Sequence, residues 1–372
     1  MRRIRWLPLC IAAVIVTAAC APSTQMAPAP KSSSLTCPRG QDAPTFSPSS
    51  TSSRNLELVN LKGSRKYVVR DLTDILNVSN VSTLDDKGSG WRFASSSELS
   101  YFDDQGIVRM PFGGAPKTAV ACAHVWALAW SPDATSAAYV TSTDGAGNSE
   151  LHIVSGGQNR LVETMTGNPL TDCNGYDCAE RISVDLSYSP DGASVSYVQS
   201  WGGPVFRLWK ADGTQAKSLD GTGKGPGQAT FPSMSVWSGT RLYWRDDKGI
   251  EVWQNGQQTL LLPGVAWIHP HASPGAALIT YMTRDPSTGQ PDVYVFDTNT
   301  GKITQIAKFR SEPRFLNSHL IWYREERPCV PADTLPCPDA KMIPSGKTDI
   351  YDLQDKTEIE SLVQAVFDVW PH

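Results

Sequence analysis

Short stretches of alternating apolar and polar residues run from about residue 55 to the end of the chain. The two clearest, 128–139 and 186–197, each contain an alternating segment, a Ser-Pro-Asp sequence and a second alternating segment. A period of two, interrupted by turn-forming residues, is typical of β-strands joined into hairpins. The pattern therefore predicts an all-β protein.

The hairpin pattern repeats along the chain. The two clear copies end at Tyr139 and Tyr197, and weaker copies end at Tyr101, Tyr243, Tyr281 and Trp322. A third alternating stretch follows each copy, and usually a fourth, so that one unit takes about 40 to 45 residues. Four strands with this period indicate the blades of a β-propeller.

The number of blades depends on how the two ends of the repeat region are interpreted. Six blades are complete, and the stretches Asn55–Leu61, Lys66–Leu72 and Val81–Leu84 look like strands two to four of another. The chain ends with Ala365–Trp370, which looks like the first strand of a blade that does not continue. Joining the two ends gives a seventh, composite blade and removes the exposed sheet edges. We expect seven blades, with six as the alternative.

Two of the turns resemble a known repeat. The sequences Trp130-Ser-Pro-Asp133 and Tyr188-Ser-Pro-Asp-Gly192 are similar to the W-S-P-D-G motif of the WD40-like repeats in TolB-type propellers. The resemblance implies a propeller over residues 55–372, although the other blades keep only remnants, such as Ser273-Pro-Gly275. The separate N-terminal domain of TolB is not expected here, so that family's role and partners are not carried over.

The first residues have the pattern of an export signal. Three arginines within residues 2–5 precede a mostly apolar run, Trp6–Val16, which is too short to span a membrane. Thr17-Ala-Ala-Cys20 then resembles the lipobox of bacterial lipoproteins, with Thr17 where Leu is usual. We expect a signal peptide over 1–19 and a lipid on Cys20, on the extracytoplasmic face of a bacterial membrane. An ordinary secretory signal, giving a soluble secreted or periplasmic protein, is the alternative.

The segment 20–54 is rich in Pro, Ser and Thr and has almost no apolar periodicity, which is typical of a disordered tether. The formal charge of the whole chain is −4, which excludes a strongly basic nucleic-acid binder. Loss of the signal arginines would make the mature chain more acidic still. Attachment to a membrane would therefore rest on the N-terminal lipid alone.

The cysteines support export. Without the signal residue Cys10 and the lipidated Cys20, six of the eight cysteines remain. Two close pairs lie in turn-like sequence, and the third pair follows by elimination among 15 connectivities. The predicted disulfides are Cys173–Cys178, Cys329–Cys337 and Cys37–Cys122. Zinc binding is the rival interpretation, but neither close pair has CxxC spacing.

No catalytic motif, metal site or cofactor site stands out in the sequence, and we expect none. The sequence has no G-x-S-x-G elbow, H-E-x-x-H motif or phosphate-binding glycine loop. His269 and His271 would share one face of a strand and could bind a metal, but turn sequence around Pro270 is the simpler explanation. The alternating oxygen-bearing residues of 144–150 could bind calcium, with a polar hairpin loop as the alternative.

Propeller topology places the loops between second and third strands, and between blades, on one face. These are the long ones, at 142–149, 164–181, 199–204, 219–231, 283–291 and 324–347. Because long loops on a rigid scaffold often bind ligands, we expect this face to meet the partner, unless the loops merely decorate it. The candidate binding residues are Trp201, Arg284, Asp285, Arg324 and Glu325.

The function expected from these features is non-catalytic binding of an envelope protein or glycan by a lipid-anchored scaffold, without nucleic acid. The alternative is a hydrolase or lyase that cleaves an envelope polymer at the channel mouth, for which paired carboxylates would be needed. A propeller that regulates a peptidase in trans is a further option. The sequence does not indicate an oligomeric state.

Overall fold

The structure is a computed structural model that contains two compact units, Met1–Ser34 and Leu35–His372. It describes residues of the second unit only: 37, 43–47, 54–64, 66–74, 78–84, 88–122, 124–142, 148–166, 184–199, 205–214, 216–219, 235–245, 248–275, 277–330 and 342–370. Cys20 and most of the predicted signal and tether lie outside these residues. Within them, no helix is long and apolar enough to cross a membrane.

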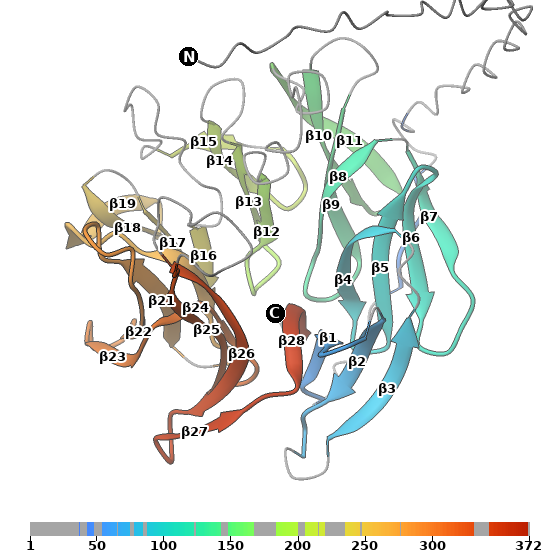
Figure 1. The fold of residues 1–372 in the computed structure, drawn as a ribbon. Helices are drawn as coiled ribbons and strands as arrows, with labels where there is room; N and C mark the ends of the chain where they lie inside the picture. The colour runs from blue at the N-terminus through green and yellow to red at the C-terminus, as the bar shows by residue number, and fades with distance from the viewer. Residues whose placement is uncertain are drawn as a thin grey trace, which may run out of the picture. The chain divides into compact units, whose positions relative to one another are not determined.

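Seven four-stranded antiparallel sheets form a β-propeller, as the sequence predicted (Figure 1). Blade 1 contains β28 (Val363–Trp370), β1 (Leu56–Leu61), β2 (Tyr67–Asp71) and β3 (Ser79–Leu84). Blade 2 contains β4 (Ser89–Ser95), β5 (Glu98–Asp103), β6 (Gly106–Pro111) and β7 (Lys117–Ala121). Blade 3 contains β8 (Val125–Trp130), β9 (Ser136–Ser142), β10 (Asn148–Ser155) and β11 (Gln158–Thr166).

The remaining blades follow in chain order. Blade 4 contains β12 (Val184–Tyr188), β13 (Ser194–Gln199), β14 (Val205–Lys210) and β15 (Ala216–Ser218). Blade 5 contains β16 (Ser235–Ser238), β17 (Arg241–Arg245), β18 (Gly249–Gln254) and β19 (Gln257–Pro263). Blade 6 contains β20 (Ile268–Ala272), β21 (Leu278–Arg284), β22 (Pro291–Asp297) and β23 (Ile303–Lys308). Blade 7 contains β24 (Arg310–Phe315), β25 (Leu320–Pro328), β26 (Met342–Asp352) and β27 (Thr357–Glu360).

The composite blade closes the ring. In Figure 1 the C-terminal strand β28 lies beside β1, and the two pair antiparallel from Leu56 opposite Trp370 to Leu61 opposite Val363. Val59 and Val366 are both buried in this blade. The predicted closure of the ring by the two ends of the chain is thus confirmed, and the six-bladed alternative is wrong.

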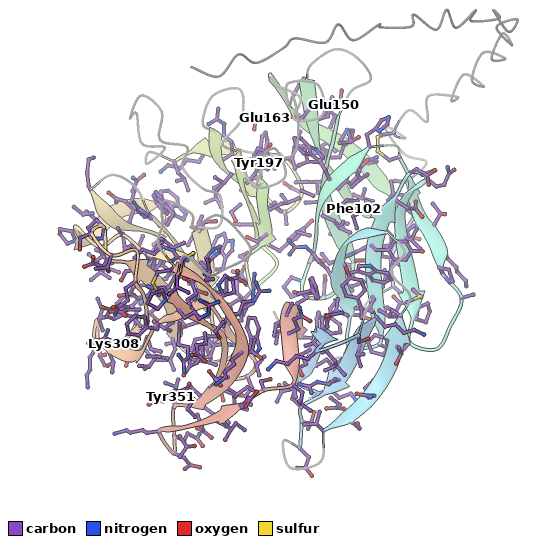
Figure 2. All side chains as sticks on the ribbon, viewed as in Figure 1. Phe102, Glu150, Glu163, Tyr197, Lys308 and Tyr351 are labelled. Atoms are coloured by element: carbon purple, nitrogen blue, oxygen red, sulfur yellow. A yellow bond between two sulfur atoms is a disulfide. The ribbon has the colours of Figure 1, made fainter. Side chains whose placement is uncertain are left out.

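The core lies between neighbouring blades, where large rings and aliphatic side chains fill the space between sheets. Tyr197, labelled in Figure 2, is fully buried in a cluster with Tyr188 of its own blade and Ala138 and Ile153 of blade 3. Similar clusters lie between the other blades. A single sheet buries only one face well, so each blade depends on its neighbours for stability.

The Ser-Pro-Asp turns are held by side-chain hydrogen bonds. In blade 3 the Ser131 hydroxyl donates to Asp133 at 2.6 Å and accepts the backbone N–H of Ser136 at 2.9 Å. Ala134 is left-handed here, with φ 61°, at the position that Gly192 occupies in blade 4. The motif therefore sets a tight turn between the first two strands, which brings the end of the innermost strand to one face of the ring.

Part of the predicted tether is attached to the propeller. Cys37 forms a disulfide with Cys122 at the end of blade 2, as the sequence predicted. The backbone N–H of Ala43 donates to Gly157 O at 3.2 Å, and the Phe46 ring packs edge-on against Trp130. The segment fixed to the propeller thus begins no later than Cys37, inside the range 20–54 predicted to be a tether. The sequence did not predict this attachment, because it rests on a few side chains in a segment without apolar periodicity.

Candidate functional site

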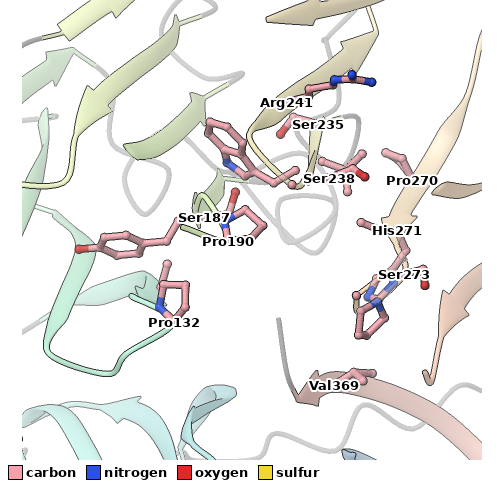
Figure 3. Close-up of a pocket in the computed structure, with 18 of the residues that line it drawn as sticks. Pro132, Ser187, Pro190, Ser235, Ser238, Arg241, Pro270, His271, Ser273 and Val369 are labelled. Atoms are coloured by element: carbon pink, nitrogen blue, oxygen red, sulfur yellow. The ribbon is translucent and has the colours of Figure 1, made fainter. Parts of the chain in front are cut away.

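A cavity of about 710 Å³ lies where the innermost strands of the seven blades meet (Figure 3). Every blade contributes residues of its first strand to the lining. The volume falls in the range of small-molecule sites in proteins. The centre of the ring therefore offers a concave, pre-formed surface.

The cavity is lined by the short turns of the propeller. Pro132 and Pro190 come from the two Ser-Pro-Asp turns, and Ser238, labelled in Figure 3, precedes the equivalent turn of blade 5. Thr298 and Asn299 come from the turn between β22 and β23. Turns of both kinds lie on the face opposite the long loops. The described cavity is therefore on the other face from the one that the loop lengths favoured.

The charged residues of the described lining are three arginines and one carboxylate. Arg92 on β4, Asp368 on β28 and Arg314 on β24 come from blades 2, 1 and 7, which are successive around the ring. Arg241, at the start of β17, donates to the backbone oxygen of Thr298 at 3.0 Å. The described lining thus carries a net positive charge.

Two hydrogen bonds fix polar groups of this lining. The backbone N–H of Phe93 donates to the Asp368 carboxylate at 2.7 Å, across the boundary between blades 2 and 1. The backbone N–H of Phe315 donates to Nδ1 of His271 at 3.2 Å, across the boundary between blades 7 and 6. In the neutral imidazole of His271 the ring proton therefore sits on Nε2.

A shared irregularity of the backbone precedes three lining residues. Gly90, His269 and Glu312 are left-handed, with φ values of 63°, 50° and 52°, and each lies at a register shift between the first and second strands of its blade. The residues two positions later are Arg92, His271 and Arg314, which all line the cavity. A bulge re-aims the side chains that follow it, and these three blades use it in the same way.

Apolar groups complete the lining. Trp237 and Phe367 come from innermost strands, and Pro270 and Pro274 flank His271. Phe367 is 42% exposed, which is high for a large apolar ring. The cavity thus combines cations with ring and proline surfaces, the usual composition of a site for an organic ligand.

Four of the binding residues predicted from the sequence, Arg284, Asp285, Arg324 and Glu325, are described, and they lie on the long-loop side. Arg284 binds Glu326 of the next blade through two hydrogen bonds, at 2.7 and 2.9 Å. Arg324 pairs with Glu312 at 3.1 Å. Burial lowers the pKa of His269, and the positive charges of Arg284 and Arg324 lower it further. The structure therefore gathers Arg284 and Arg324 around one histidine near the channel.

The other predicted residues of this face are less connected. The Asp285 carboxylate accepts hydrogen bonds from Ser287 and Thr288 within its own turn, which lower its pKa to about 2. Glu325 lies opposite Arg310 in the pairing of β24 with β25. Trp201 lies outside the described residues. Whether this face binds a partner remains a prediction.

The cysteine and metal predictions have mixed coverage. Cys329 is disulfide-bonded, and its predicted partner Cys337 lies outside the described residues, as do Cys173 and Cys178. His269 and His271 do not share a face of a regular strand. His269 is left-handed and lies in a register shift between Ile268 and His271, which breaks the strand alternation there. Among the described residues no group of three potential metal ligands is present. Most of the 144–150 stretch also falls outside.

Sequence reasoning missed Arg92, Arg314 and Asp368. Each is a charged residue between apolar neighbours in a strand that the repeat places innermost, as in Trp91-Arg92-Phe93 and Phe367-Asp368-Val369. A charge in the strand nearest the ring axis can face only the channel or a neighbouring blade. That signal was available from the repeat and the composite blade.

Comparison with known proteins supports the fold and goes no further. No family model and no curated protein matches the chain. Among solved structures it is similar to a chain from a structural study of two prolyl endopeptidases, with 11% identity and a TM-score of 0.52 over 85% of this chain and 50% of that chain. It is also similar to TolB from Acinetobacter baumannii, with 15% identity and a TM-score of 0.44 over 86% of this chain and 67% of that chain. The β-propeller domain of the Trilobed protease from Pyrococcus furiosus is also similar, with 10% identity and a TM-score of 0.44 over 82% of this chain and 84% of that chain. At these identities the likeness shows a β-propeller fold alone.

Proposed function

We propose that the protein is exported, is held at the extracytoplasmic face of a bacterial membrane by a lipid on Cys20, and binds an envelope protein or glycan without catalysing a reaction. The observation that carries this proposal is the central cavity, which is lined by the innermost strands of all seven blades. Concave sites of this size on rigid scaffolds are where ligands bind.

Export is supported by two independent features. The residues before Cys20 have the pattern of a lipoprotein signal. The Cys37–Cys122 disulfide is typical of proteins that fold in an oxidising compartment. Cys37 is only 17 residues beyond Cys20, so a lipid there would hold the propeller close to the membrane. Partition into detergent of wild type, and loss of that partition in Cys20→Ser, would test the anchor.

Binding is favoured over catalysis by the groups in the lining. Arginines, prolines and aromatic rings hold ligands through charge and contact area. Cleavage of a polymer by acid–base chemistry uses a pair of carboxylates, and the carboxylate of the described lining, Asp368, is engaged by the Phe93 N–H. The cavity is therefore better suited to recognition.

The test is capture by the full chain, tagged at its C-terminus and solubilised in mild detergent without reductant. Envelope protein and purified cell-wall glycan are offered in separate experiments. One variant, Thr240→Trp with Asn299→Trp, narrows the cavity at two exposed lining residues. The matched control, Thr304→Trp with Thr357→Trp, adds the same rings to exposed positions on the outer strands β23 and β27.

We expect wild type and the control to retain one protein or one glycan in stoichiometric amount, and the cavity variant to lose it. Equal retention by the cavity variant, or no retention by wild type, would contradict the proposal. Arg324→Glu tests the long-loop face in the same experiment. If that variant alone loses the ligand, the long-loop face and not the cavity is the binding surface.

A further inference from the structure

The cavity contains two cations without a hydrogen-bonded carboxylate partner among the described residues. The guanidinium groups of Arg92 and Arg314 form no hydrogen bond or close ion pair with another described residue, and both side chains are half-buried. Arg314 is half-buried, and it lines the cavity. A shielded charge without a paired carboxylate is costly, and an anionic ligand would offset that cost.

The charges around Arg314 define the ligand that fits. Asp368 and Glu312 attract it, whereas Arg92 and Arg324 repel it. Glu312 and Arg324 neutralise each other in an ion pair. Arg92, Arg314 and Asp368 remain around this position, with a net charge of +1, whereas the third arginine of the lining, Arg241, comes from blade 5 and does not act on Arg314. One singly charged anionic group balances this charge, whereas a dianionic phosphate would exceed it beside Asp368.

Arg314 keeps its charge in this setting. Burial lowers the pKa of its guanidinium, and the repulsion from Arg92 acts in the same direction. Because an arginine titrates so far above neutral pH, it remains protonated there even so. The charges of Arg92 and Arg314 interact, so the two groups are near each other. A planar carboxylate matches the geometry of a guanidinium and is the anion that such groups bind best.

The backbone shows that these positions are built at a cost. Glu312 and His269 adopt left-handed conformations, which are unfavourable for residues with a side chain. Gly90 adopts the same conformation in blade 2, where a Cβ would approach the Phe102 ring to 2.0 Å. These three irregularities place Arg92, His271 and Arg314 on the lining. Strained backbone of this kind concentrates at functional sites.

We propose that the cavity binds the carboxylate of an organic acid between Arg92 and Arg314, while Trp237, Phe367 and the prolines of the lining hold its apolar part. The inference deepens the proposed function, because it names the chemistry of a ligand for that cavity. The carboxylate could belong to a free small acid or to the C-terminal end of a partner chain. Both sources present the same group.

The test measures binding of matched probes to the full chain by calorimetry and by thermal unfolding at constant ionic strength. Benzoate represents a free acid. A peptide, acetyl-Ser-Pro-Ala-Pro-Phe, represents a chain end and is compared with its C-terminal amide. We expect at least one acid probe to raise the Tm by about 5 °C near 100 times its Kd. The amide should bind at least tenfold more weakly than the acid peptide if the peptide binds.

Arg314→Gln and Arg92→Gln should each raise the Kd for that acid probe by about 10- to 100-fold. The control Arg160→Gln removes the same charge from an exposed position on the outer strand β11 and should bind as wild type does. Without ligand, Arg314→Gln should melt no lower than wild type, because burial and the repulsion from Arg92 and Arg324 outweigh the attraction of Asp368 and Glu312. If it fails to fold, Arg92→Gln, which is on a different strand, gives the same comparison.

Tighter binding of the acid peptide than of benzoate would assign the carboxylate to a chain end, and the reverse order to a free acid. The proposal is overturned if neither acid binds, if the amide binds as well as the acid peptide, or if both arginine variants bind as the control does. Failure to capture an envelope partner with an intact acid site would overturn the proposed function alone. Capture without carboxylate binding would overturn this inference alone.

Discussion

The indole Nε1 of Trp130 donates a hydrogen bond of 2.7 Å to the hydroxyl of Ser100, which links blade 3 to blade 2. The same bond recurs between Trp237 of blade 5 and Ser196 of blade 4, at 3.0 Å. In both cases the tryptophan is near the end of an innermost strand, and the serine precedes the tyrosine of the second strand in the preceding blade. Some of the aromatic residues of the repeat therefore tie blades together through polar groups as well as packing.

Ser100→Ala is expected to lower the free energy of unfolding by about 1–3 kcal/mol, because it leaves the buried N–H of Trp130 without its acceptor. Ser196→Ala should have an effect of similar size through Trp237. Urea unfolding followed by tryptophan fluorescence measures both. If the free energy of unfolding falls by less than about 0.5 kcal/mol in both variants, these two hydrogen bonds do not stabilise the contact between blades.

Blade 4 offers the opposite case. The Tyr188 hydroxyl is buried and has no hydrogen-bond partner among the described residues, and burial raises its pKa. The preceding blade has Ala138 where the other two blades have the serines. Tyr188→Phe is therefore expected to raise the free energy of unfolding by about 1 kcal/mol. Thermal unfolding measures the change.

Tyr139→Phe is the matched control for this substitution. The Tyr139 hydroxyl accepts a hydrogen bond from the Asn159 amide at 2.7 Å, so its loss should destabilise the protein. If Tyr188→Phe destabilises the protein as much as Tyr139→Phe does, the Tyr188 hydroxyl has a partner in solution.

Arg284 is expected to act mainly in the contact between blades 6 and 7. Its pair with Glu326 is bidentate, and the Glu326 side chain is 7% exposed. Arg284→Met would leave that carboxylate buried and unpaired, at a cost of about 3 kcal/mol. Arg324→Met breaks a pair whose carboxylate partner, Glu312, is 42% exposed, and should cost less than about 1 kcal/mol.

A double-mutant cycle with Glu326→Leu separates the pair from other effects of Arg284. We expect the double variant to be more stable than Arg284→Met alone, because it removes the unpaired charge. Additive losses would mean that the two side chains act independently.

The disulfide between Cys37 and Cys122 should stabilise the propeller although Cys37 lies outside it. The bond closes a loop with a sequence separation of 85 residues. Replacing both cysteines by Ala is expected to lower the free energy of unfolding by about 2–4 kcal/mol. The measurement is urea unfolding with and without dithiothreitol, and the reductant should lower the midpoint less in the double variant, which keeps the disulfide of Cys329. An unchanged midpoint would mean that the attached segment unfolds separately from the blades.

The fold was largely predictable because a repeat constrains every blade at once. Two clear hairpins, 128–139 and 186–197, set the pattern for weaker copies, and the unpaired ends of the chain required a composite blade. The cavity was harder to predict because loop length favoured one face, whereas the described lining comes from short turns on the other. The left-handed residues His269 and Glu312, which precede the lining positions, have no signal in composition or periodicity.

The turn at Asp285 should respond to acid. Hydrogen bonds from Ser287 and Thr288 hold the pKa of Asp285 at about 2, below its value in the unfolded chain near 3.9. A depressed pKa in the folded state adds stability that is present above the unfolded value and is lost as the pH falls toward 2. Asp285→Asn should therefore lower the Tm at pH 6, and the difference from wild type should shrink between pH 4 and pH 3.

Asp297→Asn should behave alike, because backbone N–H groups of Asn299 and Thr300 lower the pKa of Asp297. A Tm deficit that stays constant from pH 6 to pH 3 would show that the amide fails to fit the turn, and that the charge of Asp285 contributes nothing.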